Sequence, residues 1–175
     1  GAVFACDPES AAEVTAAVRR VTTLPLMVKL SPNVGDIVGI AMAVEEAGAD
    51  SLSLINTLVG MKIDVRRRRP FLGNETGGLS GPAVRPVAVR MVYQVAQMVR
   101  IPIVGIGGIA SLDDALEFLM AGASAVQVGT AIFVDPLTPI RLVDDLAGFM
   151  EREGVTRLNE LTGAANARFL GPTAR

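Results

Sequence analysis

The sequence contains no histidine and only one cysteine, Cys6. An internal disulfide needs two cysteines, and a zinc site of the usual kind needs several cysteine or histidine ligands, so both are excluded. Any acid–base chemistry would therefore fall to Cys, Lys, Asp, Glu or Tyr side chains. We expect no metal site.

Aromatic residues make up 4% of the chain, and the net charge is −2. Neither stacking platforms nor a basic footprint is present, so we expect no nucleic-acid partner. No apolar run approaches the roughly 18 residues of a membrane span. With no signal peptide in evidence, we expect a cytoplasmic location and no membrane contact. The first residue is Gly1 rather than Met, which indicates a missing start.

The chain is nevertheless apolar, with 50% hydrophobic residues and a mean hydropathy of +0.45 over 175 residues. Parallel strands that are buried on both faces read as continuous Val, Ile, Leu and Ala runs, and they account for this excess.

Strand-like and helix-like segments alternate along the chain. Strands are predicted over residues 24–30, 49–56, 101–105 and 124–129, and helices over 7–21, 36–47 (capped by Asn33 or Asp36), 82–99, 111–120 and 138–153. This alternation predicts an α/β fold with a parallel sheet and right-handed crossovers. We expect one domain over 1–163 and an irregular tail over 164–175.

The two last predicted strands end in glycine, at Gly105–Gly108 and at Gly129-Thr130. The last two strands of a (β/α)8 barrel hold a phosphate at such turns, whereas a doubly wound sheet carries its glycine fingerprint at the first strand. The barrel is therefore favoured. Four strands are half of the eight required and leave two open edges, so the sequence predicts the C-terminal half of a TIM barrel.

A long connection, residues 57–82, separates the second predicted strand from the next helix, and it contains four consecutive arginines, Arg66–Arg69. Apolar residues flank the arginines, as in a hairpin with a charged tip. A solvated turn is a better interpretation than a site for an anionic partner. Because the connection is long, we expect it to lie over the mouth of the barrel as a lid or to face a partner.

Several blocks identify a family when they are taken together. Val28-Lys29-Leu30-Ser31-Pro32-Asn33, Leu54-Ile55-Asn56-Thr57 and Thr76-Gly77-Gly78-Leu79-Ser80-Gly81-Pro82 occur in one order with the two glycine turns. The chain resembles class 1B dihydroorotate dehydrogenases, the NAD-linked two-subunit type, over residues 4–154. The resemblance implies an FMN-containing barrel that oxidises dihydroorotate to orotate in de novo pyrimidine biosynthesis. This chain would supply its strands five to eight.

The resemblance also implies the site residues. It assigns FMN contacts to Lys29, Ile55, Gly81, Gly107, Gly108, Gly129 and Thr130, and substrate contacts to Asn56 and Thr57. A cation at Lys29 can stabilise the negative charge of a reduced flavin, although a strand-end lysine can also simply reach solvent. An amide at Asn56 suits a pyrimidine because it both donates and accepts.

The catalytic base of the resembled family is a cysteine in a Ser-Cys-Pro-Asn loop, and this sequence has no such motif. Cys6, in Phe4-Ala5-Cys6-Asp7-Pro8, is not assigned to catalysis. The base is expected upstream of Gly1, so no catalytic residue is assigned here and the chain alone is predicted to be inactive.

The resemblance further implies a homodimer and an electron-transfer subunit that carries FAD and an iron–sulfur cluster and reduces NAD. A cluster needs about four cysteine ligands, so this chain cannot hold one alone. Two alternatives stay open: a flavin-free isomerase or synthase barrel that binds sugar phosphates, and a non-catalytic half-barrel that dimerises to bury its open edges.

Overall fold

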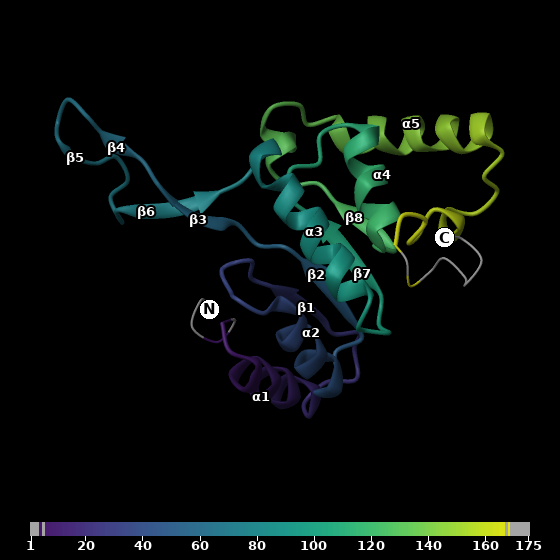
Figure 1. Ribbon diagram of the computed structural model, residues 1–175, viewed down its shortest axis with the longest axis horizontal. Helices are drawn as coiled ribbons and strands as arrows, with labels where there is room; N and C mark the ends of the chain where they lie inside the picture. Colours follow the sequence, from purple (N-terminus) through teal and green to yellow (C-terminus); the bar gives the residue numbers. More distant parts are fainter. Residues whose placement is uncertain (1–3, 5, 167, 169–175) are drawn as a thin grey trace.

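Four parallel strands form the central sheet, in the order β1-β2-β7-β8 (Figure 1). They are β1 (Met27–Leu30), β2 (Ser51–Leu54), β7 (Ile103–Ile106) and β8 (Ala125–Gln127). The register aligns Lys29 with Ser53 and Ser53 with Val104. The computed structural model describes residue 4, residues 6–166 and residue 168.

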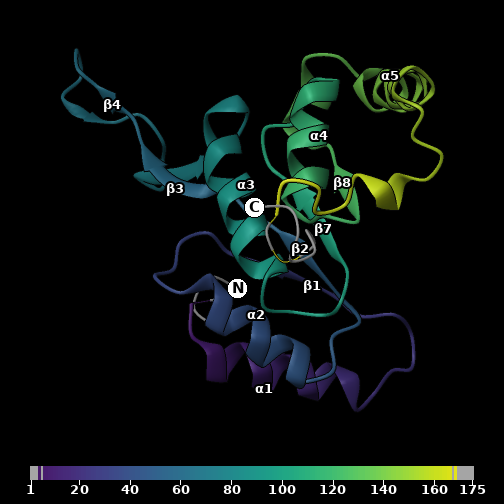
Figure 2. The same cartoon turned by 45° about the vertical axis from the view of Figure 1, so that its right-hand side comes forward.

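Helices follow the strands along the chain and pack on the sheet. The helices are α1 (Pro8–Arg19), α2 (Ile37–Glu46), α3 (Arg85–Ala96), α4 (Leu112–Ala121) and α5 (Thr138–Glu153), with short 3-10 turns η1 (Pro82–Val84), η2 (Thr130–Phe133) and η3 (Leu158–Glu160). Neighbours contact one another from α1 to α5 in chain order, and α2, α3 and α4 contact the strands (Figure 2). This succession is the outer layer of a barrel segment.

The hydrophobic core lies between the sheet and α2, α3 and α4. Leu52 and Leu54 of β2 are fully buried there with Val92 of α3 and Phe118 of α4. Burial of each such side chain stabilises the fold by about 1.5–3 kcal/mol. The strands therefore supply alternate residues to this core, which fixes their register.

The opposite face of the sheet is open. Met27 and Lys29 of β1 and Gln127 of β8 are exposed on it. Within the described part of the chain, β1 and β8 each pair on one side only, and the sheet does not close. The predicted parallel α/β architecture with two open edges is confirmed, and it is a partial barrel.

The start of α2 agrees with one of the two predicted caps, and the start of α3 differs from the prediction. Asp36 caps α2 by accepting the Gly39 N–H at 2.9 Å, whereas Asn33 bonds to the chain beyond β2. The helix predicted over 82–99 begins as the separate turn η1, and the chain enters this turn through Gly81, whose φ of 81° suits only glycine.

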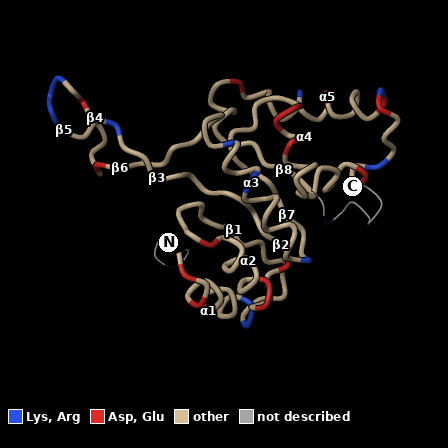
Figure 3. Tube along the Cα trace, viewed as in Figure 1, with Lys and Arg blue, Asp and Glu red and all other residues tan. Residues whose placement is uncertain are grey.

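The connection between β2 and α3 forms an arm of two antiparallel ladders. The ladders pair β3 (Leu58–Met61) with β6 (Thr76–Leu79), and β4 (Ile63–Asp64) with β5 (Arg69–Pro70). The hairpin predicted around the arginines is confirmed. The predicted lid is wrong for the tip, because the paired strands carry the arginines away from the body, as Figure 3 shows. Only the base of the arm lies near the strand ends.

An ion pair joins α1 to the N-terminal end of β2. Arg19 Nη1 lies 2.8 Å from Asp50 Oδ2, and the same oxygen accepts the Leu26 N–H at 2.7 Å. The Leu26 N–H, and then Arg19, hold the pKa of Asp50 below its usual value. This pair is therefore an anchor at the edge of the sheet opposite to the carboxyl ends.

The predicted tail, 164–175, lies largely outside the described residues. Asn166, which is described, is fully buried, and its Nδ2 donates to the carbonyls of Tyr93 and Ala121. The division at residue 163 stays a prediction. Among the described residues, no helix combines the length and the apolar character that crossing a membrane requires.

We predict that Gly105→Ala lowers the free energy of unfolding by about 1–3 kcal/mol, because the new methyl group overpacks the core. A Cβ at Gly105 would lie 2.5 Å from Cδ1 of Phe118. Urea unfolding followed by circular dichroism measures the change. Gly35→Ala is the control, since a Cβ there meets nothing within 4 Å. Equal midpoints for the two variants would contradict the packing described.

Candidate functional site

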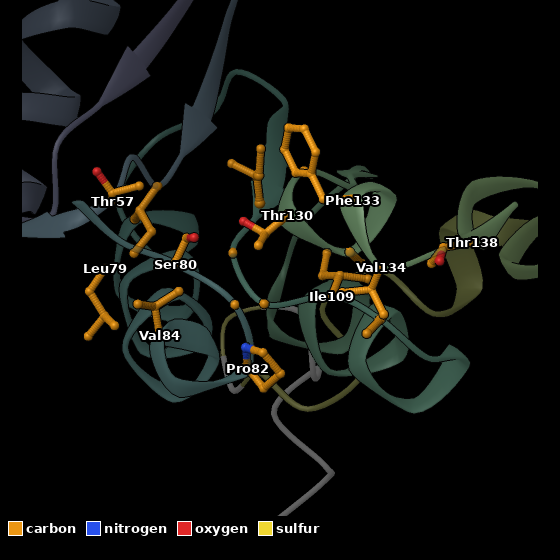
Figure 4. A pocket seen from close by; sticks show the side chains of 18 of the residues that line it. Thr57, Leu79, Ser80, Pro82, Val84, Ile109, Thr130, Phe133, Val134 and Thr138 are labelled. Carbon is orange, nitrogen blue, oxygen red and sulfur yellow. The ribbon is translucent and has the colours of Figure 1, made fainter. Parts of the chain in front are cut away.

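A pocket of about 610 Å³ lies at the carboxyl ends of the parallel strands. Its volume is in the range of small-molecule and cofactor sites. Figure 4 shows one wall formed by Thr57, Leu79, Ser80 and Val84, and another by Thr130, Phe133 and Val134. The base of the arm thus faces η2 across the cavity.

All nine predicted site residues line this one pocket, namely Lys29, Ile55, Asn56, Thr57, Gly81, Gly107, Gly108, Gly129 and Thr130. They come from four strand ends and from the turn that follows the arm. Parallel strands bring their carboxyl ends together, which is why residues 100 positions apart in sequence meet here. Their roles toward a cofactor or a substrate stay predictions.

Lys29 supplies positive charge to the pocket. It lies near the end of β1 on the open face of the sheet, and its ammonium group has no hydrogen bond or ion pair with any described residue. The other charged lining residue, Asp135, is paired with Arg141 at 2.6 Å. Lys29 is therefore available to a negatively charged ligand.

Asn56 and Thr57 follow β2 directly. The Asn56 N–H donates to the Leu30 carbonyl at 3.0 Å, which ties this turn to β1. The Asn56 side-chain oxygen accepts the Thr57 N–H at 2.9 Å, and its amide NH₂ group has no partner among the described residues. This amide group can donate two hydrogen bonds to a ligand.

Asn33 is a supporting residue whose role the sequence did not reveal. Its Nδ2 donates to the Thr57 carbonyl at 2.9 Å, and its Oδ1 accepts the Val59 N–H at 2.8 Å. One side chain thus holds the chain on both sides of Leu58, just after the predicted substrate residues. The Ser-Pro-Asn block was the available signal, but it fits a helix cap equally well.

Two glycine turns approach each other at the centre of the pocket. Gly81, Gly107 and Gly108 have φ values of 81°, 142° and 74°, which side-chain-bearing residues rarely adopt. A Cβ at Gly108 would lie 2.6 Å from the Gly81 carbonyl oxygen. The turns after β6 and β7 therefore touch through their backbones, and glycine is required for the contact.

Gly129 and Thr130 form the third turn, after β8. A Cβ at Gly129 would meet no atom within 4 Å, so this position faces open space. Phe133 and Val134 of the following turn line the pocket and are 91% and 88% exposed. Sequence reasoning missed this apolar wall, because two apolar residues after a strand indicate a core position as readily as a pocket.

Cys6 is absent from the lining of the pocket. Its Sγ lies 3.8 Å from the Asn33 carbonyl oxygen and donates to it. No group of three or more Cys, Asp or Glu side chains able to hold a metal occurs in the described ranges. The chemistry of the pocket is accordingly that of a cation, an amide, a hydroxyl and glycine backbone around an apolar cavity.

These features fit a phosphorylated, partly planar ligand. Glycine turns at the ends of the last two barrel strands present backbone N–H groups to a phosphate, and the apolar walls suit an aromatic ring system. The fold and the pocket together define a segment of a (β/α)8 barrel with a cofactor-sized pocket at the carboxyl ends of its strands.

Comparison with known proteins makes this class specific. The family model for dihydroorotate dehydrogenase matches residues 1–150, and the chain belongs to this family. It is 56% identical over 165 residues to dihydroorotate dehydrogenase B (NAD(+)), catalytic subunit, of Halalkalibacterium halodurans, covering 94% of this chain and 54% of that relative. It is 57% identical over 164 residues to the protein of the same name from Pelobacter propionicus, with the same two shares covered.

A third relative is the putative dihydroorotate dehydrogenase A (fumarate) of Solibacter usitatus, whose name gives fumarate in place of NAD. It is 55% identical over 93% of this chain and 54% of its own length. The chain spans about half the length of the relatives it matches. Sequence identity therefore does not separate the relatives named for NAD from the one named for fumarate.

We predict that Gly108→Ala lowers the free energy of unfolding by about 2 kcal/mol or more, since a left-handed alanine costs about 1–2 kcal/mol before the steric clash is added. Gly129→Ala is the matched variant, and its cost is expected to be clearly smaller, because its Cβ meets nothing within 4 Å. Urea unfolding of the two variants measures the difference. A larger loss at Gly129 would contradict the contact between the two turns.

Proposed function

We propose that this chain provides the cofactor-binding half of an FMN-dependent dihydroorotate dehydrogenase, which oxidises dihydroorotate to orotate in de novo pyrimidine biosynthesis. The observation that carries the proposal is the convergence of an unpaired Lys29, the Asn56 amide and three glycine turns in one pocket. The family match supports this choice over a flavin-free isomerase or synthase barrel.

Bound FMN would supply the acceptor for the hydride that leaves C6 of dihydroorotate. Gly107, Gly108, Gly129 and Thr130 would hold the cofactor, because their turns leave room for close approach of a ligand to the backbone. Ile55 and Gly81 would contact it from the ends of β2 and of the arm. Lys29 would stabilise the negative charge that develops when the ring is reduced.

Asn56 and Thr57 would orient the substrate against the cofactor. The Asn56 NH₂ group can donate to a carbonyl or carboxylate oxygen of the pyrimidine, and the bond from the Thr57 N–H fixes which way the amide faces. Asn33 would keep this turn in place through its two bonds to the chain on either side of Leu58.

The base that removes the C5 proton would come from outside these residues, since Cys6 does not line the pocket. Two relatives are named as catalytic subunits. By analogy, we propose that the complete protein forms a homodimer in the cytoplasm and passes electrons to NAD through a subunit that carries FAD and an iron–sulfur cluster.

The test is a chimera that joins the N-terminal part of an NAD-linked relative to this chain. We expect the chimera to retain FMN through gel filtration and to form orotate from dihydroorotate, with this chain alone forming none above background. If the chimera retained FMN but formed no orotate, the proposal for this chain would reduce to a half-barrel that binds flavin. A chimera that folds and takes up no FMN would overturn the proposal.

Gly129→Ala in the chimera is predicted to weaken FMN binding at least tenfold, because the added methyl group enters the space a ligand would occupy. Fluorescence titration with FMN measures the dissociation constant. Gly35→Ala, whose Cβ also meets nothing within 4 Å but which lies outside the pocket, is the control and is expected to bind normally. Equal affinities would show that the ligand sits elsewhere.

Lys29→Met is predicted to slow orotate formation about 100-fold, since removal of one group that stabilises developing charge has effects of this size. It should also make the two-electron potential of bound FMN more negative by tens of mV, on the scale of about 30 mV per 1.4 kcal/mol. Lys29→Arg keeps the charge and should retain most of the rate. An unchanged potential in Lys29→Met would contradict the role of Lys29.

A further inference from the structure

An ion pair behind the pocket joins the two glycine turns that meet at its centre. Arg85 is the first residue of α3, directly after the turn that starts at Gly81. Asp114 lies in the first turn of α4, just after the turn at Gly107 and Gly108. Nη1 of Arg85 is hydrogen-bonded to Oδ1 of Asp114, so the pair spans two successive βα units.

The Asp114 carboxylate bonds in two directions at once. Its Oδ2 accepts the N–H groups of Ala110 at 2.9 Å and Ser111 at 3.0 Å, which continue the turn from Gly108. Its Oδ1 receives Arg85. Capping of α4 requires only the backbone bonds, so the bond to Arg85 does something more than end a helix.

Burial makes this pair unlike an ordinary surface ion pair. The Asp114 side chain is 10% exposed and that of Arg85 is 27% exposed. Nε of Arg85 is buried without a hydrogen bond, and it forms a longer ion pair with Oε2 of Glu117 at 3.5 Å. A partly desolvated pair loses much more than a surface pair when one partner is removed.

Neither residue lines the pocket, so the pair can act on a ligand only through the turns it joins. In front of it, the Gly81 carbonyl and Gly108 are in backbone contact, with no room for a Cβ. We infer that Arg85 and Asp114 are positioning residues that set the distance between the Gly81 turn and the Gly107-Gly108 turn, and thereby shape the cradle for the cofactor. This inference rests on the proposed function for the identity of the cofactor.

The Arg19–Asp50 pair provides a matched control. It has the same chemistry, an arginine bonded to an aspartate that also accepts a backbone N–H, and it lies at the opposite edge of the sheet. Arg19→Met deletes this bond together with the bonds from Arg19 Nη2 to the carbonyls of Thr22 at 2.7 Å and Leu24 at 2.8 Å, so the control removes more hydrogen bonds than Arg85→Met does. Only removal of the Arg85–Asp114 pair should alter the pocket.

The first measurement is amide hydrogen exchange in the full chain without ligand. Arg85→Met, which keeps an unbranched apolar side chain, should speed amide exchange at Gly81, Ala83 and Val84 and at residues 107–111 at least tenfold relative to wild type. Arg85→Lys should restore most of the protection. The double variant Arg85→Met with Asp114→Asn should be no worse than Arg85→Met alone, because both changes remove the same bond. Arg19→Met should leave these amides unchanged.

The second measurement is FMN affinity in the chimera. Arg85→Met should raise the dissociation constant at least tenfold and leave the KM for dihydroorotate of the FMN-saturated enzyme unchanged, since Asn56 and Thr57 lie on another strand end. Arg19→Met should change neither value. If wild type binds no FMN but Arg85→Met still loosens the two turns, the proposed function fails and the positioning role stands. Unchanged exchange at 107–111, or a change no larger than in Arg19→Met, would overturn the inference.

Discussion

The four strands of the sheet all run in the same direction, and this constraint determines where the site is. Parallel strands place every carboxyl end at one edge, and each chain segment leaving that edge must turn back toward a helix. The end of β1, through Lys29, and the turns after β2, β7 and β8 therefore meet around one cavity. The helices and the buried face of the sheet serve to hold this edge in register.

Close backbone approach is the second requirement, and it explains why the turns consist largely of glycine. The Gly81 carbonyl lies where a side chain on Gly108 would be, and Phe118 lies where a side chain on Gly105 would be. Glycine thus does two things here: at Gly81 and Gly108 it permits the contact of two turns in front, and at Gly105, within β7, it lets α4 pack closely behind. The ion pair of Arg85 and Asp114 joins the start of α3, directly after the Gly81 turn, to the first turn of α4.

Much of this arrangement could be predicted from the sequence. Alternating apolar and helical segments gave the four strands in order, and the glycine turns identified the edge that carries the pocket. The nine residues that the resemblance assigned to FMN or substrate contacts all line that pocket. These sequence patterns are local, or depend on strand direction alone, so they can be interpreted without knowledge of tertiary contacts.

Other features depend on contacts between distant segments and were missed. Asn33 looked like a helix cap, yet it bonds to a turn 24 residues away. The arm was expected to cover the pocket as a lid or to face a partner, and the pairing of β3 with β6 directs its tip outward, which excludes a lid formed by the tip. The bond from Arg85 to Asp114 likewise joins residues 29 positions apart, and no periodicity of the sequence predicts such a contact.

The measurement that tests the account most directly is a crystal structure of the chimera grown with FMN. We expect the phosphate within hydrogen-bond distance of the backbone N–H groups at Gly108 and Thr130, with the ring beside Lys29. FMN bound at any other place, or a phosphate that contacts only side chains, would contradict the claim that the glycine turns form the cofactor site.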